Sequence, residues 1–223
     1  MDFIYNNKIL NPQECDFIKN YILENEDYMK SLGPDVYPGT SDDSLTGRYR
    51  YLNMLHTPIG DILLPKLKNI FKELDLHYPV TIQSWANTFR NGEGIAKHVH
   101  GHYTNTDTQK YISGNLFVSG PTSIGTWYGS EKYENEAGFL TLFPCDTSHY
   151  VPENTTDDVR ISIAIDISSG TKPPKSGELQ SGYYEGRRNN IEKTQTKRFY
   201  VIEEPIKRTK PIPSNGRKLW NTL

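Results

Sequence analysis

The hydrophobic pattern of this chain changes its period near residue 80, and that change restricts the folds open to it. Before residue 80, apolar side chains recur at the spacing of one helix face, over residues 12–23 and again over 57–74. After it come five short strand-like runs separated by turns rich in Gly, Pro and Asn: 80–89, 110–119, 124–128, 138–143 and 159–167. Short strands at near-even spacing predict a β-sandwich or a barrel. We therefore expect a mainly β fold with flanking helices, namely a double-stranded β-helix (a cupin-like jelly roll).

The N-terminal part of the chain carries clear boundary signals. Asn11, Pro12 and Glu14 form a helix start, with a capping side chain, a proline at the first helical position and an acid in the first turn. Residues 48–55 alternate in the manner of a strand. The intervening segment 31–47 is rich in Gly, Pro, Ser and Asp, and it is either a lid over a site or a solvated connection.

The charge of the chain divides it into two parts. Residues 1–169 hold thirteen Lys/Arg against twenty-two Asp/Glu, whereas residues 170–223 hold twelve against five. We expect residues 1–169 to form one jelly-roll domain with N-terminal helices. Residues 170–223 are a basic, Pro-containing extension, partly extended or disordered, in which residues 199–202 add a strand to the main sheet. Its basic excess suits an acidic partner surface or the acidic body itself better than nucleic acid, because aromatic residues for base stacking are sparse.

The cysteine content and the absence of long apolar runs bear on the compartment. Cys15 and Cys145 are the two cysteines of the chain, too few for a disulfide framework, and free thiols fit a reducing cytosol. The sequence shows no basic-then-apolar leader and no apolar run near 18 residues. We expect a cytoplasmic protein with no membrane partner.

Three histidines in the second half of the chain have the spacing of a metal site. His98 and His100 are two residues apart, so an extended backbone points both side chains to the same face. A third ligand must come from elsewhere in the sheet, and His149 is the candidate. Three side chains on one face of a metal leave its other positions open for substrate and O2, as in non-haem Fe(II) oxygenases. Imidazole also binds zinc, copper and nickel, so these residues alone do not identify the metal.

An arginine and a serine downstream have the same two-residue spacing. Arg160 and Ser162 lie in an alternating run and share one face with Ala164 and Asp166. A guanidinium fork beside a hydroxyl is suited to holding a carboxylate. Arg160 is alternatively the partner of a structural ion pair, since an arginine within an apolar strand is costly unless it is paired.

Other assignments of the same residues remain open at this point. His98 and His100 are alternatively exposed polar residues that follow a turn. His102 or Asp107 competes with His100 as a ligand, because His100 and His102 are also two residues apart. Asn115, on the strand after the H-x-H step, either hydrogen-bonds a bound oxoacid or is a satisfied core amide.

The ordered motifs of residues 84–167 resemble the 2-oxoglutarate/Fe(II)-dependent oxygenase superfamily. More narrowly, they are similar to a branch common in bacteria and tailed phages, with the pattern W-x-N, glycine turn, H-x-H, S-G, F-P, H and R-x-S. The matching residues are Trp85, Asn87, Gly92, Gly94, His98, His100, Ser113, Gly114, Phe143, Pro144, His149, Arg160 and Ser162.

The resemblance implies an oxygenase that hydroxylates an unknown substrate with succinate and CO2 as co-products. The substrate is a protein residue, a nucleobase or a metabolite. By the same resemblance His98, His100 and His149 hold Fe(II), whereas Arg160 and Ser162 bind the distal carboxylate of 2-oxoglutarate. No catalytic residue beyond the metal ligands is implied, and the compartment is the host cytoplasm if the chain is phage-encoded.

One departure from the wider superfamily concerns the second metal ligand. That position usually holds a carboxylate, and here it holds His100, which leaves the metal with more net positive charge. Two other classes of protein therefore compete with the oxygenase. One is a cupin-type metal dioxygenase that does not use 2-oxoglutarate, and the other is a non-enzymatic β-sandwich, such as a virion or carbohydrate-binding protein.

Overall fold

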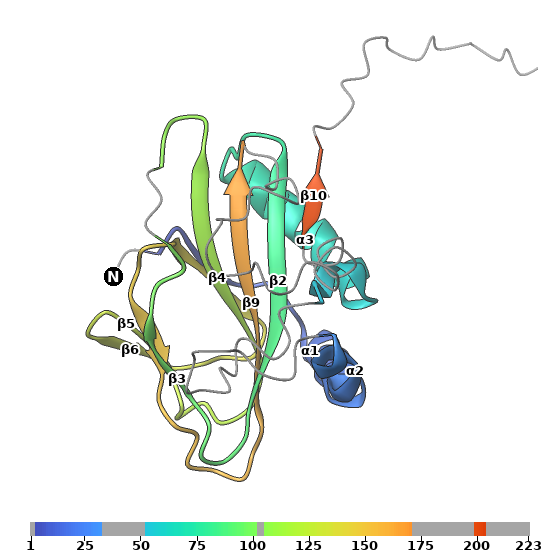
Figure 1. The fold of residues 1–223 in the computed structure, drawn as a ribbon, viewed down its shortest axis with the longest axis vertical. Helices are drawn as coiled ribbons and strands as arrows, with labels where there is room; N and C mark the ends of the chain where they lie inside the picture. The colour runs from blue at the N-terminus through green and yellow to red at the C-terminus, as the bar shows by residue number, and fades with distance from the viewer. Residues whose placement is uncertain (1–2, 33–51, 102–104, 171–198, 204–223) are drawn as a thin grey trace, which may run out of the picture.

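The computed structural model describes residues 3–32, 52–101, 105–170 and 199–203, and its described strands form two antiparallel sheets (Figure 1). The larger sheet has the order β1-β7-β4-β9-β2-β10. Its strands are β1 (Tyr5–Lys8), β7 (Phe139–Pro144), β4 (Lys110–Ser119), β9 (Arg160–Ser169), β2 (Val80–Phe89) and β10 (Tyr200–Ile202). The smaller sheet has the order β3-β8-β5-β6. Its strands are β3 (Ile95–His98), β8 (His149–Val151), β5 (Thr126–Tyr128) and β6 (Glu131–Tyr133).

The helices all lie on one side of the larger sheet, opposite the smaller sheet (Figure 1). They are α1 (Pro12–Glu24), α2 (Glu26–Ser31), the 3-10 helix η1 (Met54–His56) and α3 (Ile59–Glu73). Asn11 caps α1 as expected: its side chain accepts from the Glu14 N–H, and the Glu14 carboxylate accepts from the Asn11 N–H, both at 2.9 Å. None of the described helices combines the length and the apolarity needed to cross a membrane.

The main core lies between these helices and the larger sheet. Apolar side chains at alternate positions of the strands pack against the stripe of α3; examples are Leu63, Leu67, Ile163, Ile165 and Leu140. The opposite face of the same strands points toward the smaller sheet and carries the polar groups Asn87, Arg160 and Ser162, all buried. One face of each long strand therefore stabilises the fold, and the other is available for a site.

The predicted double-stranded β-helix with flanking helices is confirmed, and two of the predicted strands have the expected bounds. The runs 80–89 and 110–119 have the bounds of β2 and β4, and the strand expected at 199–202 pairs with β2 as β10. The strand predicted at 48–55 is wrong for its described part, since residues 54–56 form η1. Asn53 causes this, because its side-chain oxygen accepts from the Leu55 N–H at 3.0 Å and caps the 3-10 turn.

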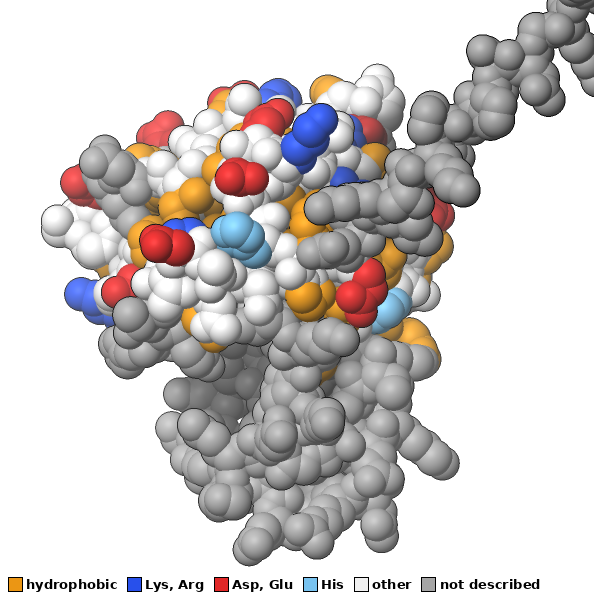
Figure 2. All heavy atoms as spheres, turned by 90° about the horizontal axis from the view of Figure 1, so that it is seen from above, with side chains coloured by type: hydrophobic (Ala, Val, Ile, Leu, Met, Phe, Trp, Pro, Cys, Tyr) orange, Lys and Arg blue, Asp and Glu red, His pale blue; other side chains and the backbone are white. Residues whose placement is uncertain are grey.

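Several expectations fall outside the part of the chain that the structure describes. These are the segment 31–47 beyond residue 32, His102 and most of the basic extension, namely 171–198 and 204–223. On the face seen from above in Figure 2, acidic and basic side chains are interspersed over the described surface. The coloured, described part of that face therefore forms no continuous basic surface of the kind that attracts nucleic acid.

Candidate metal and anion site

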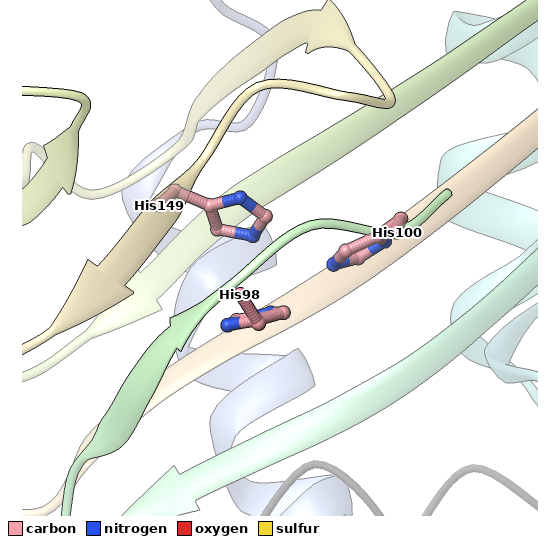
Figure 3. A group of neighbouring side chains, drawn as sticks. All are labelled: His98, His100 and His149. Carbon is pink, nitrogen blue, oxygen red and sulfur yellow. The ribbon is translucent and has the colours of Figure 1, made fainter. Parts of the chain in front are cut away.

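Three histidine rings converge between the two sheets (Figure 3). His98 ends β3, His149 begins β8, and these two residues are directly opposite each other in the β3–β8 pairing. His100 follows β3, and its N–H donates to the Cys145 carbonyl at 2.9 Å, which fixes the backbone beyond the strand end. One potential ligand atom from each ring lies within 4.8 Å of the other two. The pairing of two short strands thus brings together residues about fifty positions apart in the sequence.

Each of the three rings has its Nδ1 atom against a hydrogen-bond acceptor. His98 Nδ1 lies 2.8 Å from the Ala96 carbonyl and His149 Nδ1 lies 2.9 Å from the Thr147 carbonyl. His100 Nδ1 lies 2.5 Å from a carboxylate oxygen of Asp166. Carbonyls and carboxylates only accept, so each Nδ1 carries a proton, and in a neutral ring the Nε2 atom keeps the lone pair. This arrangement fixes the tautomer that a metal ligand requires.

The environment of His98 and His149 favours the neutral form that binds metals. Burial lowers the pKa of His149 to about 3, with further contributions from His98 and His100. Burial also lowers the pKa of His98, and His100 adds to that shift. Both groups are therefore neutral at physiological pH, and no proton has to leave them when a metal binds.

Arg160 is fully buried at the start of β9. Its guanidinium donates to Ser162 Oγ at 3.3 Å and to Thr126 Oγ1 at 3.0 Å, while its Nε has no partner. The rings of Phe89 and Phe117 each lie 5.4 Å from its central carbon. Burial lowers the pKa of Arg160 to about 10, so the side chain is still a cation at neutral pH. No described carboxylate forms an ion pair with it, which leaves a buried charge uncompensated.

The histidines and Arg160 line one pocket between the sheets. Its empty space, the open mouth included, is about 410 Å³, and Asn115 and Ser162 are also in its wall. Strands β2 and β9 both contribute to this wall because they pair side by side, with Asn87 opposite Ser162 and Trp85 opposite Ala164. Two further buried polar atoms in this wall lack partners in the described structure, Trp85 Nε1 and Asn87 Oδ1. Such orphaned groups mark a place where a polar ligand restores the missing hydrogen bonds.

The residues expected from the sequence are placed as follows. His98, His100, His149, Arg160, Ser162 and Asn115 all line the pocket. Asp107 is exposed and does not belong to the histidine cluster. Sequence reasoning missed the role of three residues. Trp85 and Asn87 belong to the sequence motif, but the motif gives them no role in binding. The alternation of β9 places Asp166 on the same strand face as Arg160, but it does not reveal the partner His100. That alternation of strand residues is the signal in the sequence for the pocket wall.

Comparison with known proteins identifies the fold. No protein-family model matches this chain, and no curated protein matches it in sequence. Among solved structures, HygX from Streptomyces hygroscopicus, with nickel and 2-oxoglutarate bound, has a TM-score of 0.52 at 11% identity, over 80% of this chain and 89% of that one. A prolyl-4-hydroxylase from Pseudomonas putida has a TM-score of 0.51 at 14% identity, over 73% and 90%. The apo form of the non-heme monooxygenase ThoJ has 0.50 at 14%, over 88% and 92%. The chain therefore has the double-stranded β-helix fold that these enzymes share.

Proposed function

We propose that this chain is an Fe(II)- and 2-oxoglutarate-dependent oxygenase that hydroxylates a substrate still to be identified. The observation that carries the proposal is the buried Arg160, without a carboxylate partner among the described residues, in the same pocket as three histidines with fixed tautomers. A metal site alone needs no buried cation, and a structural arginine is normally paired. A dicarboxylate that reaches from a metal to Arg160 accounts for both features.

In this proposal, His98, His100 and His149 hold the metal through Nε2. Arg160 and Ser162 bind the distal carboxylate of 2-oxoglutarate, and Asn115 donates to its oxoacid end. When bound, Fe(II) with 2-oxoglutarate and O2 supplies the oxidising chemistry, and succinate and CO2 are the co-products. HygX, which shares the fold, was crystallised with nickel and 2-oxoglutarate, which supports this choice of co-substrate.

The chain's own residues bind, orient and exclude water. The guanidinium neutralises the incoming carboxylate inside a wall that includes Phe89, where water cannot screen the interaction. The orphaned Trp85 Nε1 is a donor for a ligand oxygen at the centre of the pocket. The Nδ1–H bonds of the three histidines hold their rings in place, so little reorganisation accompanies metal binding.

The cellular setting and the partners are part of the same proposal. Cys15 and Cys145 are buried thiols that form no disulfide, which fits a reducing compartment, so we place the protein in the cytoplasm. If the chain is phage-encoded, that is the host cytoplasm. The basic excess of residues 170–223 suits an acidic partner, and the primary substrate is a protein residue, a nucleobase or a metabolite.

The test is an anaerobic titration of the metal-free protein with Fe(II) and then 2-oxoglutarate, monitored by the visible charge-transfer band of the chelate. Wild type should develop the band, and His149→Ala should lose it together with the metal. Arg160→Met should retain the metal but bind 2-oxoglutarate at least about tenfold more weakly, because one carboxylate loses its partner. Its free energy of unfolding should be unchanged or higher, since the mutation removes an unpaired buried charge.

The alternatives give different results in this titration. Bound iron without a band contradicts the use of 2-oxoglutarate and favours a cupin-type dioxygenase whose own substrate chelates the metal. Absence of metal binding in folded wild type contradicts the oxygenase and leaves a β-sandwich binding protein. A strongly destabilised Arg160→Met variant contradicts the ligand-binding role of Arg160 and assigns it to the structure.

A further inference from the structure

One of the three histidines differs from the other two in its hydrogen-bond partner. His98 and His149 donate to backbone carbonyls, which are neutral, whereas His100 donates to the carboxylate of Asp166 at 2.5 Å. The His100 side chain is 11% exposed and the Asp166 side chain is 33% exposed, so water screens the contact only in part. Ser113, itself buried, donates to the same Asp166 oxygen at 2.8 Å and fixes the carboxylate against the ring.

The position of Asp166 in the larger sheet directs its side chain toward His100. Asp166 lies on the pocket-facing side of β9, three inward positions beyond Arg160, and its neighbours across β2 and β4 are Gln83 and Ser113. Among the described residues no lysine or arginine forms an ion pair with it, and His100 is its partner. The negative charge of Asp166 is therefore not neutralised by a fixed cation of the described fold. A metal ion held by His100 would compensate it.

This contact bears on the net charge of the proposed metal site. Three neutral imidazoles leave a divalent ion with its full charge, whereas a carboxylate ligand would neutralise part of it. By the resemblance of its motifs, His100 occupies the position at which the wider 2-oxoglutarate oxygenase superfamily usually carries that carboxylate. A carboxylate on the far nitrogen of an imidazole makes the ring more basic and gives it partial imidazolate character.

We propose that Asp166 is a positioning residue that supplies, through His100, the negative charge that a carboxylate ligand would have supplied directly. The inference rests on the metal site of the proposed function, but it does not depend on 2-oxoglutarate. Asp166 then raises the affinity of the site for divalent metals and favours the higher oxidation state of a bound iron. Ser113 holds the carboxylate in the geometry that this requires.

The experiment compares variants that separate charge from hydrogen bonding. Asp166→Asn keeps the size of the side chain and an oxygen that accepts from His100 Nδ1, but it removes the charge. Asp166→Ala removes both, and Asp166→Glu keeps the charge. Ser113→Ala keeps the charge and removes the group that orients it. Each variant is first checked for an unchanged circular dichroism spectrum and thermal unfolding in its metal-free form.

The main readout is the affinity for Co(II), measured anaerobically by competition with a chelator and by the visible spectrum of the bound ion. Asp166→Asn should bind Co(II) roughly 10–100-fold more weakly than wild type, the range observed for outer-shell partners of metal ligands. Ser113→Ala should lose a smaller part of the affinity, and Asp166→Glu should recover most of it. With iron bound, the midpoint potential of Asp166→Asn should be higher than that of wild type.

A double variant gives the sharpest result. His100→Asp combined with Asp166→Asn moves the carboxylate from the far side of the imidazole to the metal itself. It should restore Co(II) affinity to within a few-fold of wild type, whereas Asp166→Asn alone should not. Affinity of Asp166→Asn equal to wild type overturns the proposal. So does a loss confined to Asp166→Ala, which makes Asp166 a hydrogen-bond acceptor only.

Failure of the proposed function gives a distinct result. If wild type binds no Co(II), the metal site is absent and the inference is overturned with it. If wild type binds Co(II) and Fe(II) but forms no chelate with 2-oxoglutarate, the proposed co-substrate is wrong. The ordering of the Asp166 variants by metal affinity still decides the role of this residue.

Discussion

Burial keeps His149 and His98 neutral in the wall of the pocket, and this has a measurable effect on stability. The pKa of His149 is lowered to about 3 in the folded protein, from an ordinary value of 6.5. Between these two values the unfolded chain binds more protons than the folded one. The metal-free protein must therefore lose stability as the pH falls through this range.

We predict that the free energy of unfolding of the metal-free protein decreases between about pH 6.5 and pH 4. The contribution of His149 approaches about 1.4 kcal/mol per pH unit, and His98, whose pKa is also lowered, adds to it. Urea denaturation at several pH values measures this slope. His149→Gln, which does not titrate, should flatten the dependence. An equal slope in that variant would show that other groups control the acid sensitivity.

At the scale of elements, the turn after β4 determines where Arg160 can lie. Gly120 has φ +126°, and a Cβ atom there would come within 2.6 Å of Arg160 Cα. No L side chain fits that approach, so the glycine is required for the turn to lie against the start of β9. Gly129, in the turn between β5 and β6, has φ +62°, and a Cβ atom there would have no heavy atom within 4 Å, which makes this glycine a matched control.

We predict that Gly120→Ala weakens the binding of 2-oxoglutarate as well as the fold, because the start of β9 must move and takes the guanidinium with it. Gly129→Ala should cost about 1–2 kcal/mol of stability from its left-handed backbone and leave binding intact. Thermal unfolding and the anaerobic chelate titration measure the two effects. Equal affinities in the two alanine variants would mean that the β4–β5 turn does not position Arg160.

How much of these elements the sequence predicts depends on the range of the interactions. The bounds of β2 and β4 follow from their own residues, since long strands alternate or stay apolar over ten positions. The strands β6 and β8 have three residues each, too few for a period, and they exist through their pairing with β5. The contact of His100 with Asp166 joins residues 66 positions apart in the sequence. It depends on how the two sheets pack, so no local pattern contains it.

At the scale of the whole molecule, the site and the main core are on opposite faces of the larger sheet. The core between the helices and the sheet is large and apolar, whereas the second apolar cluster consists of only Phe89, Ile124 and Val151, with Ile95 packed against it, among the described residues. In the proposed function, ligands in the pocket contact His98 and His149 of the smaller sheet and Arg160 of the larger one. Binding therefore ties together two sheets that share little apolar contact at this end.

We predict that Zn(II) and 2-oxoglutarate together stabilise the protein more than either alone, and that local opening is suppressed most around the pocket. At roughly a hundredfold excess over its Kd, a ligand adds about 2.7 kcal/mol. For a chain of this size that corresponds to a rise in Tm of roughly 5–10 °C. Hydrogen exchange should slow most in β3, β8 and the start of β9, and less in α1 and α3, which pack on the far face. Arg160→Met should keep the effect of Zn(II) and lose that of 2-oxoglutarate. Equal slowing in the helices would instead show that the two sheets open only together with the rest of the fold, as one cooperative unit, even before a ligand binds.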